Sequence, residues 1–355
     1  MLAITTYATK SYLFAWPQFI KSINAAASYK EDVHFIFSTD KSEESQQAFE
    51  YAKSHLPDGW KITCIALDLD DQDKEKYKEK SQLLITSLQE AAFSFAKKIR
   101  AKKVWSVEAD TLVKPDSLRI SEWVLNMPQA DGSPYYDVAA CTYPNGLFLG
   151  GHGTPQRQIN EDFLASERKL PERLKKLILE TEKKLKNLSL KDEEKEIDES
   201  ISIKIEKEHK RLARLTEKCK NFPTDGNIWQ VIAKYGWRRR GWLDFAYPGI
   251  GKGSIVPSDW CGFGCTLFSE KALSLINFDG YEGKGTQDLF VCWRKWHPAG
   301  VKIACIPHSP CDHVKIDKDN KNSDNLNYKH YIAYHETEGE FKDHLRITTQ
   351  PWVPI

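Results

Sequence analysis

Two acidic residues, Glu108 and Asp110, directly follow the apolar run Val104–Val107. Side chains two positions apart on a strand share one face, so both carboxylates would meet at the carboxyl end of that strand. Carboxylates in this arrangement form a hard oxygen site for Mg²⁺ or Mn²⁺, of the kind that holds the phosphates of a substrate. An acidic strand end that is merely solvated is the alternative interpretation of this pair.

A third carboxylate, Asp288, stands at the start of a helix that is predicted to run to about Trp296. The preceding Gly-Thr-Gln predicts a turn, and the helix dipole favours a carboxylate in the first helical turn. Asp288 therefore has an ordinary structural interpretation, as a residue that caps its helix. Glu282, on the glycine-containing segment just before it, is a second acidic candidate.

Two histidines, His308 and His313, follow a strand predicted over 302–306. Neutral imidazole is a common metal ligand, so His313 is a candidate to complete the metal site. The same segment also has the composition of a zinc site, although its spacing is tighter than that of zinc fingers. This alternative would use Cys305, His308, Cys311 and His313, and Cys261 and Cys265 could join them.

Alternating strands and helices in the first 110 residues must position these groups. Strands are predicted over 2–6, 33–38, 62–67 and 104–107, and helices between them are indicated by apolar residues at helical spacing. This alternation predicts an α/β fold with a mainly parallel sheet flanked by helices. Ligands of such sheets bind at the carboxyl ends of the strands. The residues found there are Thr6, Tyr7, Thr39, Asp40, residues 68–70, Glu108 and Asp110.

Residues 156–222 interrupt the pattern with a stretch that is dense in lysine and glutamate and almost free of aromatics. With a turn over Ser189–Asp192, the stretch is expected to form an antiparallel coiled-coil hairpin inserted into the α/β fold. We expect a docking or self-association arm, with a charged spacer as the alternative. A heptad pattern is formed by Leu170, Leu174, Leu177, Leu185 and Leu188, and a weaker one by Ile197, Ile201, Leu212, Leu215 and Cys219.

Globular composition returns at Pro223 and continues to the end of the chain. Strands are predicted over 265–268 and 302–306. A polar loop is predicted over 317–327.

The order of these motifs resembles the core of the GT-A glycosyltransferases, in their inverting, family-2-like form, over roughly 1–155 and 223–315. In that family an Asp-x-Asp motif binds a divalent ion and the donor diphosphate. Glu108-Ala109-Asp110 matches this motif with Glu in the first place. The resemblance implies that Asp110 holds Mn²⁺ or Mg²⁺ with help from Glu108. The family's C-terminal metal-binding histidine matches His313, with His308 as the second choice.

The resemblance also implies the remaining roles. The family's Glu-Asp pair matches Gln287-Asp288, and its aspartate is the general base of inverting members; Glu282 is the second choice for the base. The family's glycine loop resembles the segment from Trp260 to Cys265. This match places Trp260, Gly262, Phe263 and Gly264 on the acceptor side. Contacts with the donor nucleoside would come from Thr6, Tyr7, Thr39 and Asp40.

The implied domains are a nucleotide-sugar-binding half over 1–155, the hairpin over 156–222, and an acceptor-side half with the C-terminal tail over 223–355. The implied activity is inverting transfer of a hexosyl or pentosyl group from a nucleotide sugar, a UDP-sugar being favoured, to an acceptor hydroxyl. A divalent cation there would stabilise the leaving diphosphate more in the transition state than in the ground state. Lys80 or Lys252 could add electrostatic help.

Composition and charge set limits on the partners. The 355 residues, 41% of them hydrophobic, can bury a large core. A net charge of +1 provides no global attraction for nucleic acid or an anionic membrane. The basic run from Trp237 to Trp242 could still grip phosphates and stack bases, which leaves a modified base in DNA as an alternative acceptor. The Gly249-x-Gly251-x-Gly253 run lacks the flanking strand and helix of a phosphate loop, so we interpret it as a flexible substrate loop.

No apolar run approaches the roughly 20 residues that span a bilayer, and the start of the chain lacks the basic leader of a signal peptide. We therefore expect no membrane partner, a cytoplasmic location and eight reduced cysteines. Two other classes stay open. A nucleotidyltransferase of related α/β fold would not need Asp288 or His313, and a non-catalytic assembly protein built on the hairpin would not explain Glu108 and Asp110.

Overall fold

The computed structural model describes most of the chain, and every structural statement below concerns the described part. The described residues are 1–68, 81–145, 148–150, 152–153, 170–193, 199–220, 255–258, 260–283, 285–307, 309–316, 327–333 and 345–351. The chain divides into two compact units. The first comprises Met1–Thr154, Asp225–Trp229 and Trp237–Ile355, and the second comprises Pro155–Thr224 and Gln230–Gly236.

A mixed eight-stranded sheet forms the centre of the first unit, with the strand order β10-β13-β6-β12-β4-β1-β2-β3. Six of these strands run in one direction, and β10 and β12 run against them. The parallel set is β1 (Leu2–Tyr7), β2 (Val33–Asp40), β3 (Lys61–Leu67), β4 (Lys103–Val107), β6 (Val138–Cys141) and β13 (Ile303–Ile306). The two opposed strands are β10 (Val256–Ser258) and β12 (Cys265–Ser269). The expected α/β fold with a mainly parallel sheet is therefore present.

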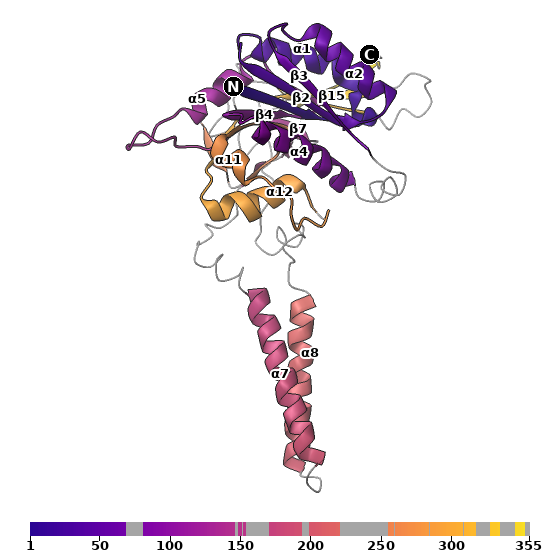
Figure 1. Cartoon of the computed structure of the whole chain (residues 1–355), viewed down its shortest axis with the longest axis vertical. Helices are drawn as coiled ribbons and strands as arrows, with labels where there is room; N and C mark the ends of the chain where they lie inside the picture. The colour runs from indigo at the N-terminus through magenta and orange to yellow at the C-terminus, as the bar shows by residue number, and fades with distance from the viewer. Residues whose placement is uncertain are drawn as a thin grey trace. The chain divides into compact units, whose positions relative to one another are not determined.

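Helices cover both faces of this sheet, as parallel strands require. One face carries α1 (Trp16–Ala27), which follows the 3₁₀ turn η1 (Lys10–Ala15), together with α2 (Glu43–His55) and α5 (Ser117–Leu125). The other face carries α4 (Ser81–Lys98) and α11 (Glu270–Leu275) (Figure 1). On the first face Trp16 packs on Phe37, with ring centroids 4.5 Å apart. On the second, the Phe93 ring meets the Phe268 ring edge to face at 5.8 Å.

Short strands from distant segments complete the first unit. A four-stranded sheet has the order β16-β15-β14-β5. Its members are β5 (Thr111–Leu112), β14 (Asp312–Ile316), β15 (Asn327–Ala333) and β16 (Leu345–Pro351). Two further pairs join β7 (Tyr143–Asn145) to β8 (Phe148–Gly150), and β9 (His152–Gly153) to β11 (Trp260–Cys261). Helix α12 (Gln287–Val291) continues into a π-helical turn, Cys292–Trp296, and a 3₁₀ turn, His297–Ala299.

The second unit contains two helices, α7 (Leu170–Glu193) and α8 (Glu199–Lys220), which pack on each other and are joined by the Lys184–Glu208 ion pair. Leu174 and Leu185 are buried, as the heptad pattern predicts, and so is Thr181, seven residues after Leu174. The turn predicted over 189–192 is wrong, because α7 runs through these residues to Glu193. This stretch has no glycine or proline, so nothing in it ends a helix. A supercoiled pairing of the two helices stays a prediction.

No helix within the described segments combines the length and the apolar character needed to cross a membrane.

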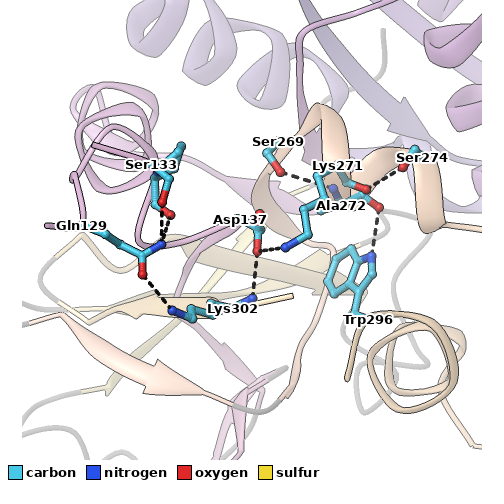
Figure 2. A network of polar contacts seen from close by, with 10 residues as sticks. Gln129, Ser133, Asp137, Ser269, Lys271, Ala272, Ser274, Trp296 and Lys302 are labelled. Atoms are coloured by element: carbon cyan, nitrogen blue, oxygen red, sulfur yellow. Dashed lines mark hydrogen bonds and ion pairs between the residues drawn. The ribbon is translucent and has the colours of Figure 1, made fainter. Parts of the chain in front are cut away.

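A polar network holds the start of β6 against its neighbours in the first unit. The Asp137 carboxylate accepts hydrogen bonds from the Lys302 backbone N–H at 3.1 Å and from Lys271 Nζ at 3.0 Å (Figure 2). The Asp137 carbonyl also accepts from the Ser269 N–H at 2.9 Å. Through its carboxylate and its backbone carbonyl, Asp137 thus ties the start of β6 to the end of β12 and to the residue before β13.

Asp137→Ala is expected to lower the free energy of unfolding by about 1 kcal/mol, because it removes the acceptor of both the Lys302 backbone N–H and Lys271 Nζ. Lys271→Ala should cost less, because the lysine side chain is 52% exposed and pairs of this kind contribute little. Urea denaturation of both variants measures the difference. Equal losses in the two variants would contradict the role given to the part-buried Asp137 carboxylate.

Candidate functional site

A cavity of about 270 Å³ lies beyond the carboxyl ends of β1 and β4. Three carboxylates and an imidazole from distant parts of the chain line it: Glu108, Asp110, Asp288 and His313. Aromatic side chains form much of the remaining wall, namely Tyr7, Tyr12, Tyr143 and Trp260. Helix α4 adds an apolar side through Leu84, Ile85 and Leu88. Convergent polar groups in a largely apolar cavity are the usual composition of a small-molecule site.

The sheet register places the glycine loop beside Glu108. Strand β12 runs antiparallel to β4 with Cys265 opposite Val107, so the residues before β12 lie beside those after β4. The Glu108 N–H accordingly donates to the Gly264 carbonyl at 2.9 Å. The loop and the acidic motif, more than 150 residues apart in the sequence, are therefore neighbours by backbone pairing.

A second pairing brings His313 to Asp110. Strand β14 lies antiparallel to β5 with His313 opposite Thr111, and the Val314 N–H donates to the Asp110 carbonyl at 2.8 Å. The imidazole Nε2 then lies 3.2 Å from Asp110 Oδ2. Because His313 is only 4% exposed, this contact forms away from bulk water.

The Asp110–His313 pair fits a divalent cation in its chemistry, since a carboxylate oxygen and an imidazole nitrogen are both ligands that Mn²⁺ accepts. Glu108 fits such a site less closely, because its carboxylate does not form a group with the Asp110 and His313 ligand atoms in which all three lie within 4.8 Å of one another. Among the described residues, a group of three ligand atoms within 4.8 Å of one another is found only at a cysteine cluster. Asp110 and His313 are thus the core of the candidate metal site, with Glu108 on the same cavity wall.

Asp288 does not cap its own helix through its side chain. The N-cap of α12 is Thr286, and Asp288 Oδ2 instead accepts from the Phe263 backbone N–H at 3.2 Å. Its Oδ1 has no hydrogen-bond partner among the described residues. Burial raises the pKa of Asp288 to about 7, although the Phe263 N–H and the Gln89 amide oppose the rise. A carboxyl group with this pKa exchanges a proton near neutral pH.

The tyrosines of the cavity stay protonated. Burial raises the pKa of Tyr7 and Tyr143 well above the usual value, and the charges of Glu108 and Asp288 raise both further. The Tyr7 hydroxyl lies 3.5 Å from the Phe263 carbonyl, and Tyr143 packs edge to face on His313 at 5.5 Å. These side chains therefore act as neutral walls and hydrogen-bond donors.

The structure gathers seven of the predicted site residues around this cavity: Tyr7, Glu108, Asp110, Trp260, Gly262, Asp288 and His313. Phe263 and Gly264 lie directly behind it, where the Phe263 ring packs on Phe268 and Trp296.

Four other predicted residues are not among the described residues that line the cavity: Thr6, Thr39, Asp40 and Glu282. Thr6 is fully buried and Glu282 is partly exposed.

Thr39 and Asp40 take part in the start of α2. Asp40 Oδ1 accepts from the Ser42 N–H at 3.1 Å and the Ser45 hydroxyl at 2.7 Å, and Thr39 Oγ1 contacts the same hydroxyl at 2.7 Å. Burial raises the pKa of Asp40, but these hydrogen bonds outweigh it and hold the pKa below its usual value. Contact with a nucleoside stays a prediction for both residues.

Sequence reasoning missed several wall residues, above all Tyr12 and Tyr143. Tyr143 follows β6, whose Val-Ala-Ala-Cys run was not recognised as a strand. Tyr12 lies in the turn η1 between β1 and α1. Its pKa is raised by burial and by the charges of Asp110 and Glu108. An aromatic residue soon after a strand would have been the available signal in both cases.

Several predicted features fall outside the described residues. They are Lys80, Lys252, His308, the basic run 237–242, the glycine run 249–253 and all of the polar loop 317–327 except Asn327, which begins β15.

The zinc alternative named Cys305, His308, Cys311 and His313, of which His308 lies outside the described residues. It is wrong for the other three, because their side chains do not lie together. His313 contacts Asp110, and Cys311 lies with Cys141 and Cys265 instead. Strand β13 pairs with β6 so that Ile306, not Cys305, is opposite Cys141, and alternation along the strand therefore places the Cys305 side chain on the other face of the sheet.

At Gly264, in the glycine loop, a side chain would collide with the acidic motif. A Cβ there would lie 2.8 Å from the Tyr143 ring and 2.9 Å from Glu108 Oε2. Gly264→Ala is expected to destabilise the fold by about 1–3 kcal/mol, as overpacking does. Gly59→Ala is the control, because its Cβ would meet nothing within 4 Å. Equal melting temperatures for the two variants would contradict the close packing at Gly264.

No protein-family model matches the sequence, and no curated protein matches it. Solved structures give partial likenesses. TarS of S. aureus, residues 1–349, is 12% identical over 44% of this chain and 41% of that chain, with a TM-score of 0.29. The galactosyltransferase LgtC, solved with donor and acceptor sugar analogues, is 17% identical over 39% and 46%, with a TM-score of 0.26. A mycobacterial protein is 8% identical over 99% and 84%, with a TM-score of 0.39.

This chain spans less than half the length of the TarS and LgtC structures that it matches. With TM-scores below 0.5, these likenesses do not establish the family of the chain.

Proposed function

We propose that this protein is a divalent-metal-dependent glycosyltransferase of the GT-A kind, which transfers a sugar from a nucleotide-sugar donor to an acceptor hydroxyl with inversion. One observation carries the proposal: Asp110, Asp288 and His313, distant in the sequence, line a single cavity at the carboxyl ends of the parallel strands. This is the edge where ligands of such sheets bind.

Asp110 and His313 would hold Mn²⁺ or Mg²⁺, with Glu108 in support. A divalent ion bound there would supply electrostatic stabilisation for the diphosphate of the departing nucleotide. The protein's own contribution is to pre-position the two ligands through the β5–β14 pairing and to keep their contact at 3.2 Å away from water. A UDP-sugar is the donor that we favour.

Asp288 is the proposed general base. Its Oδ2 is held by the Phe263 N–H at 3.2 Å, which orients the carboxyl group and leaves Oδ1 for the proton of an acceptor hydroxyl. A pKa of about 7 suits this task, because the group is substantially ionised at neutral pH yet basic enough to take a proton. The aromatic wall, including Tyr12 and Trp260, would stack on sugar or base and exclude water.

Thermal shift and turnover with UDP-, GDP- and CMP-sugars, each with and without Mn²⁺, test the proposal. We expect one donor to raise the melting temperature of the protein only when the metal is present. We also expect slow hydrolysis of that donor, which releases its free nucleotide. A nucleotidyltransferase would instead release pyrophosphate from a nucleoside triphosphate and a sugar phosphate. The absence of any metal-dependent response to the sugar donors would contradict the proposal.

For the helical unit we propose a self-association or docking role. Leu179 and Ile203 are 58% and 60% exposed there, although each is a large apolar side chain. Sedimentation of the whole protein, compared with the Leu179→Lys and Ile203→Lys variants, distinguishes an association arm from a charged spacer. A modified base in nucleic acid stays our alternative acceptor.

A further inference from the structure

Three fully buried cysteine thiols from distant parts of the chain converge behind the cavity. Cys141 ends β6, Cys265 begins β12 and Cys311 precedes β14, and their sulfur atoms all lie within 4.8 Å of one another. The backbone explains the convergence. The β6–β12 register sets Cys265 beside Cys141, and the Cys311 N–H donates to the Thr142 carbonyl at 2.7 Å.

The spacing of the three sulfurs is close to that of a thiolate metal site. With Zn–S bonds of about 2.3 Å, tetrahedral geometry sets the ligand sulfurs about 3.8 Å apart. The three thiols therefore need only a small contraction to share one ion. Soft thiolate ligands select zinc or a similar ion over Mn²⁺ and Mg²⁺, which prefer oxygen.

Buried hydroxyl groups surround the cluster on the side of α5. Ser121 Oγ lies 3.7 Å from the Cys141 sulfur, and Ser117 Oγ lies 4.0 Å from the Cys311 sulfur. Both serines are 0% exposed. The Ser117 hydroxyl already accepts from the Lys114 N–H at 3.0 Å and contacts the Ser309 hydroxyl at 3.1 Å, so the start of α5 accounts for it. The Ser121 hydroxyl, which contacts the Cys141 sulfur, would offer an oxygen ligand to a cation held by the thiolates.

The three thiols also shift one another's pKa. Hydrogen bonds from Cys265 and Cys311 hold the pKa of Cys141 well below its usual value, although burial opposes this. Burial raises the pKa of the other two thiols. A metal ion bound by the three sulfurs would displace their protons to solvent.

We propose that Cys141, Cys265 and Cys311 bind a structural zinc ion, with the Ser121 hydroxyl offering the fourth ligand. Each thiol lies within two residues of a residue that lines or backs the cavity: Tyr143, Gly264 and His313. The ion would therefore fasten together the three segments that carry the candidate active site. This inference does not depend on the proposed function, since any chemistry in the cavity would need these segments held in place.

Metal analysis of the whole protein, purified under reducing conditions and washed with a mild chelator, tests the proposal. We expect about one zinc ion per chain, as for a closed structural site. Cys265→Ser should lose the zinc. Cys305→Ser should keep it, because Cys305 is an equally buried thiol of a neighbouring strand on the opposite face.

Cobalt reconstitution keeps the test decisive if Cys265→Ser fails to fold, as judged by circular dichroism. The unsubstituted protein with Co²⁺ should show intense sulfur-to-cobalt charge-transfer absorption, which oxygen and imidazole ligands do not give. Asp110→Asn should retain both the zinc and this absorption, which separates the cluster from the cation site of the cavity. Purified protein that holds no zinc and gives no thiolate absorption with Co²⁺ would overturn the proposal, as would equal zinc loss in Cys305→Ser.

Discussion

Asp110→Asn is expected to lower metal-dependent sugar transfer by about 10³-fold, the largest loss expected of any cavity residue outside the base. The amide keeps the shape of the side chain and can still hydrogen-bond to His313 Nε2, 3.2 Å away in the unsubstituted protein. It removes the negative charge that holds the cation. Initial rates over a range of Mn²⁺ concentrations measure the effect, and the residual rate should no longer respond to the metal.

Asp68→Asn is the matched control, because Asp68 also follows a strand of the central sheet, β3, but pairs with Lys41 on the surface. It should retain transfer within a few-fold of the unsubstituted protein. If Asp110→Asn kept both its rate and its metal response, the cation site would have to lie elsewhere.

The parallel half of the sheet was predictable because each strand carries its own signal. Strands such as β1 and β4 are short buried runs between helices with a clear apolar period, and local sequence is enough to recognise them. The carboxyl-end rule then pointed to Glu108 and Asp110 without any knowledge of the partner strands. Their position beside the cavity followed from the fold class.

The short antiparallel strands β5 and β14 could not be predicted in the same way. Strand β5 has two residues, and it forms only because β14, two hundred residues later, pairs with it. Nothing local to Thr111 specifies this partner, yet the pairing is what brings His313 to Asp110. The resemblance to a known family supplied the correspondence instead, by placing a histidine after a late strand.

The cysteine cluster is a second case in which local sequence does not specify the partners. Sequence spacing suggested that Cys305 and Cys311, six residues apart, belong together. Strand alternation separates them, and sheet register brings Cys311 to Cys141 and Cys265 from far along the chain. Clusters assembled by register across a sheet leave no spacing pattern in the sequence.

Asp288→Asn is expected to lower kcat by about 10³-fold while donor binding stays near normal, because a general base contributes to the rate and not to the holding of the diphosphate. In the unsubstituted protein, kcat/KM should rise with pH through about 7, as the carboxyl group ionises. In Asp288→Asn that rise should disappear. Glu282→Gln is the control, and it should keep both the rate and the pH dependence if Asp288 is the base.

The same substitution should lower turnover but raise the relative stability of the fold at high pH. The pKa of Asp288 rises from 3.8 to about 7 on folding, so between these values the folded protein binds a proton that the unfolded chain has lost. The free energy of unfolding therefore falls as pH increases from about 4 to about 7. Asp288→Asn removes this term, so its melting temperature relative to the unsubstituted protein should be higher at pH 8 than at pH 5. A variant that loses turnover and becomes relatively more stable as pH rises would show a buried carboxylate kept for chemistry at a cost to the fold. A variant that melts lower by the same margin at both pH values would mean that Asp288 serves only to hold Phe263 in place.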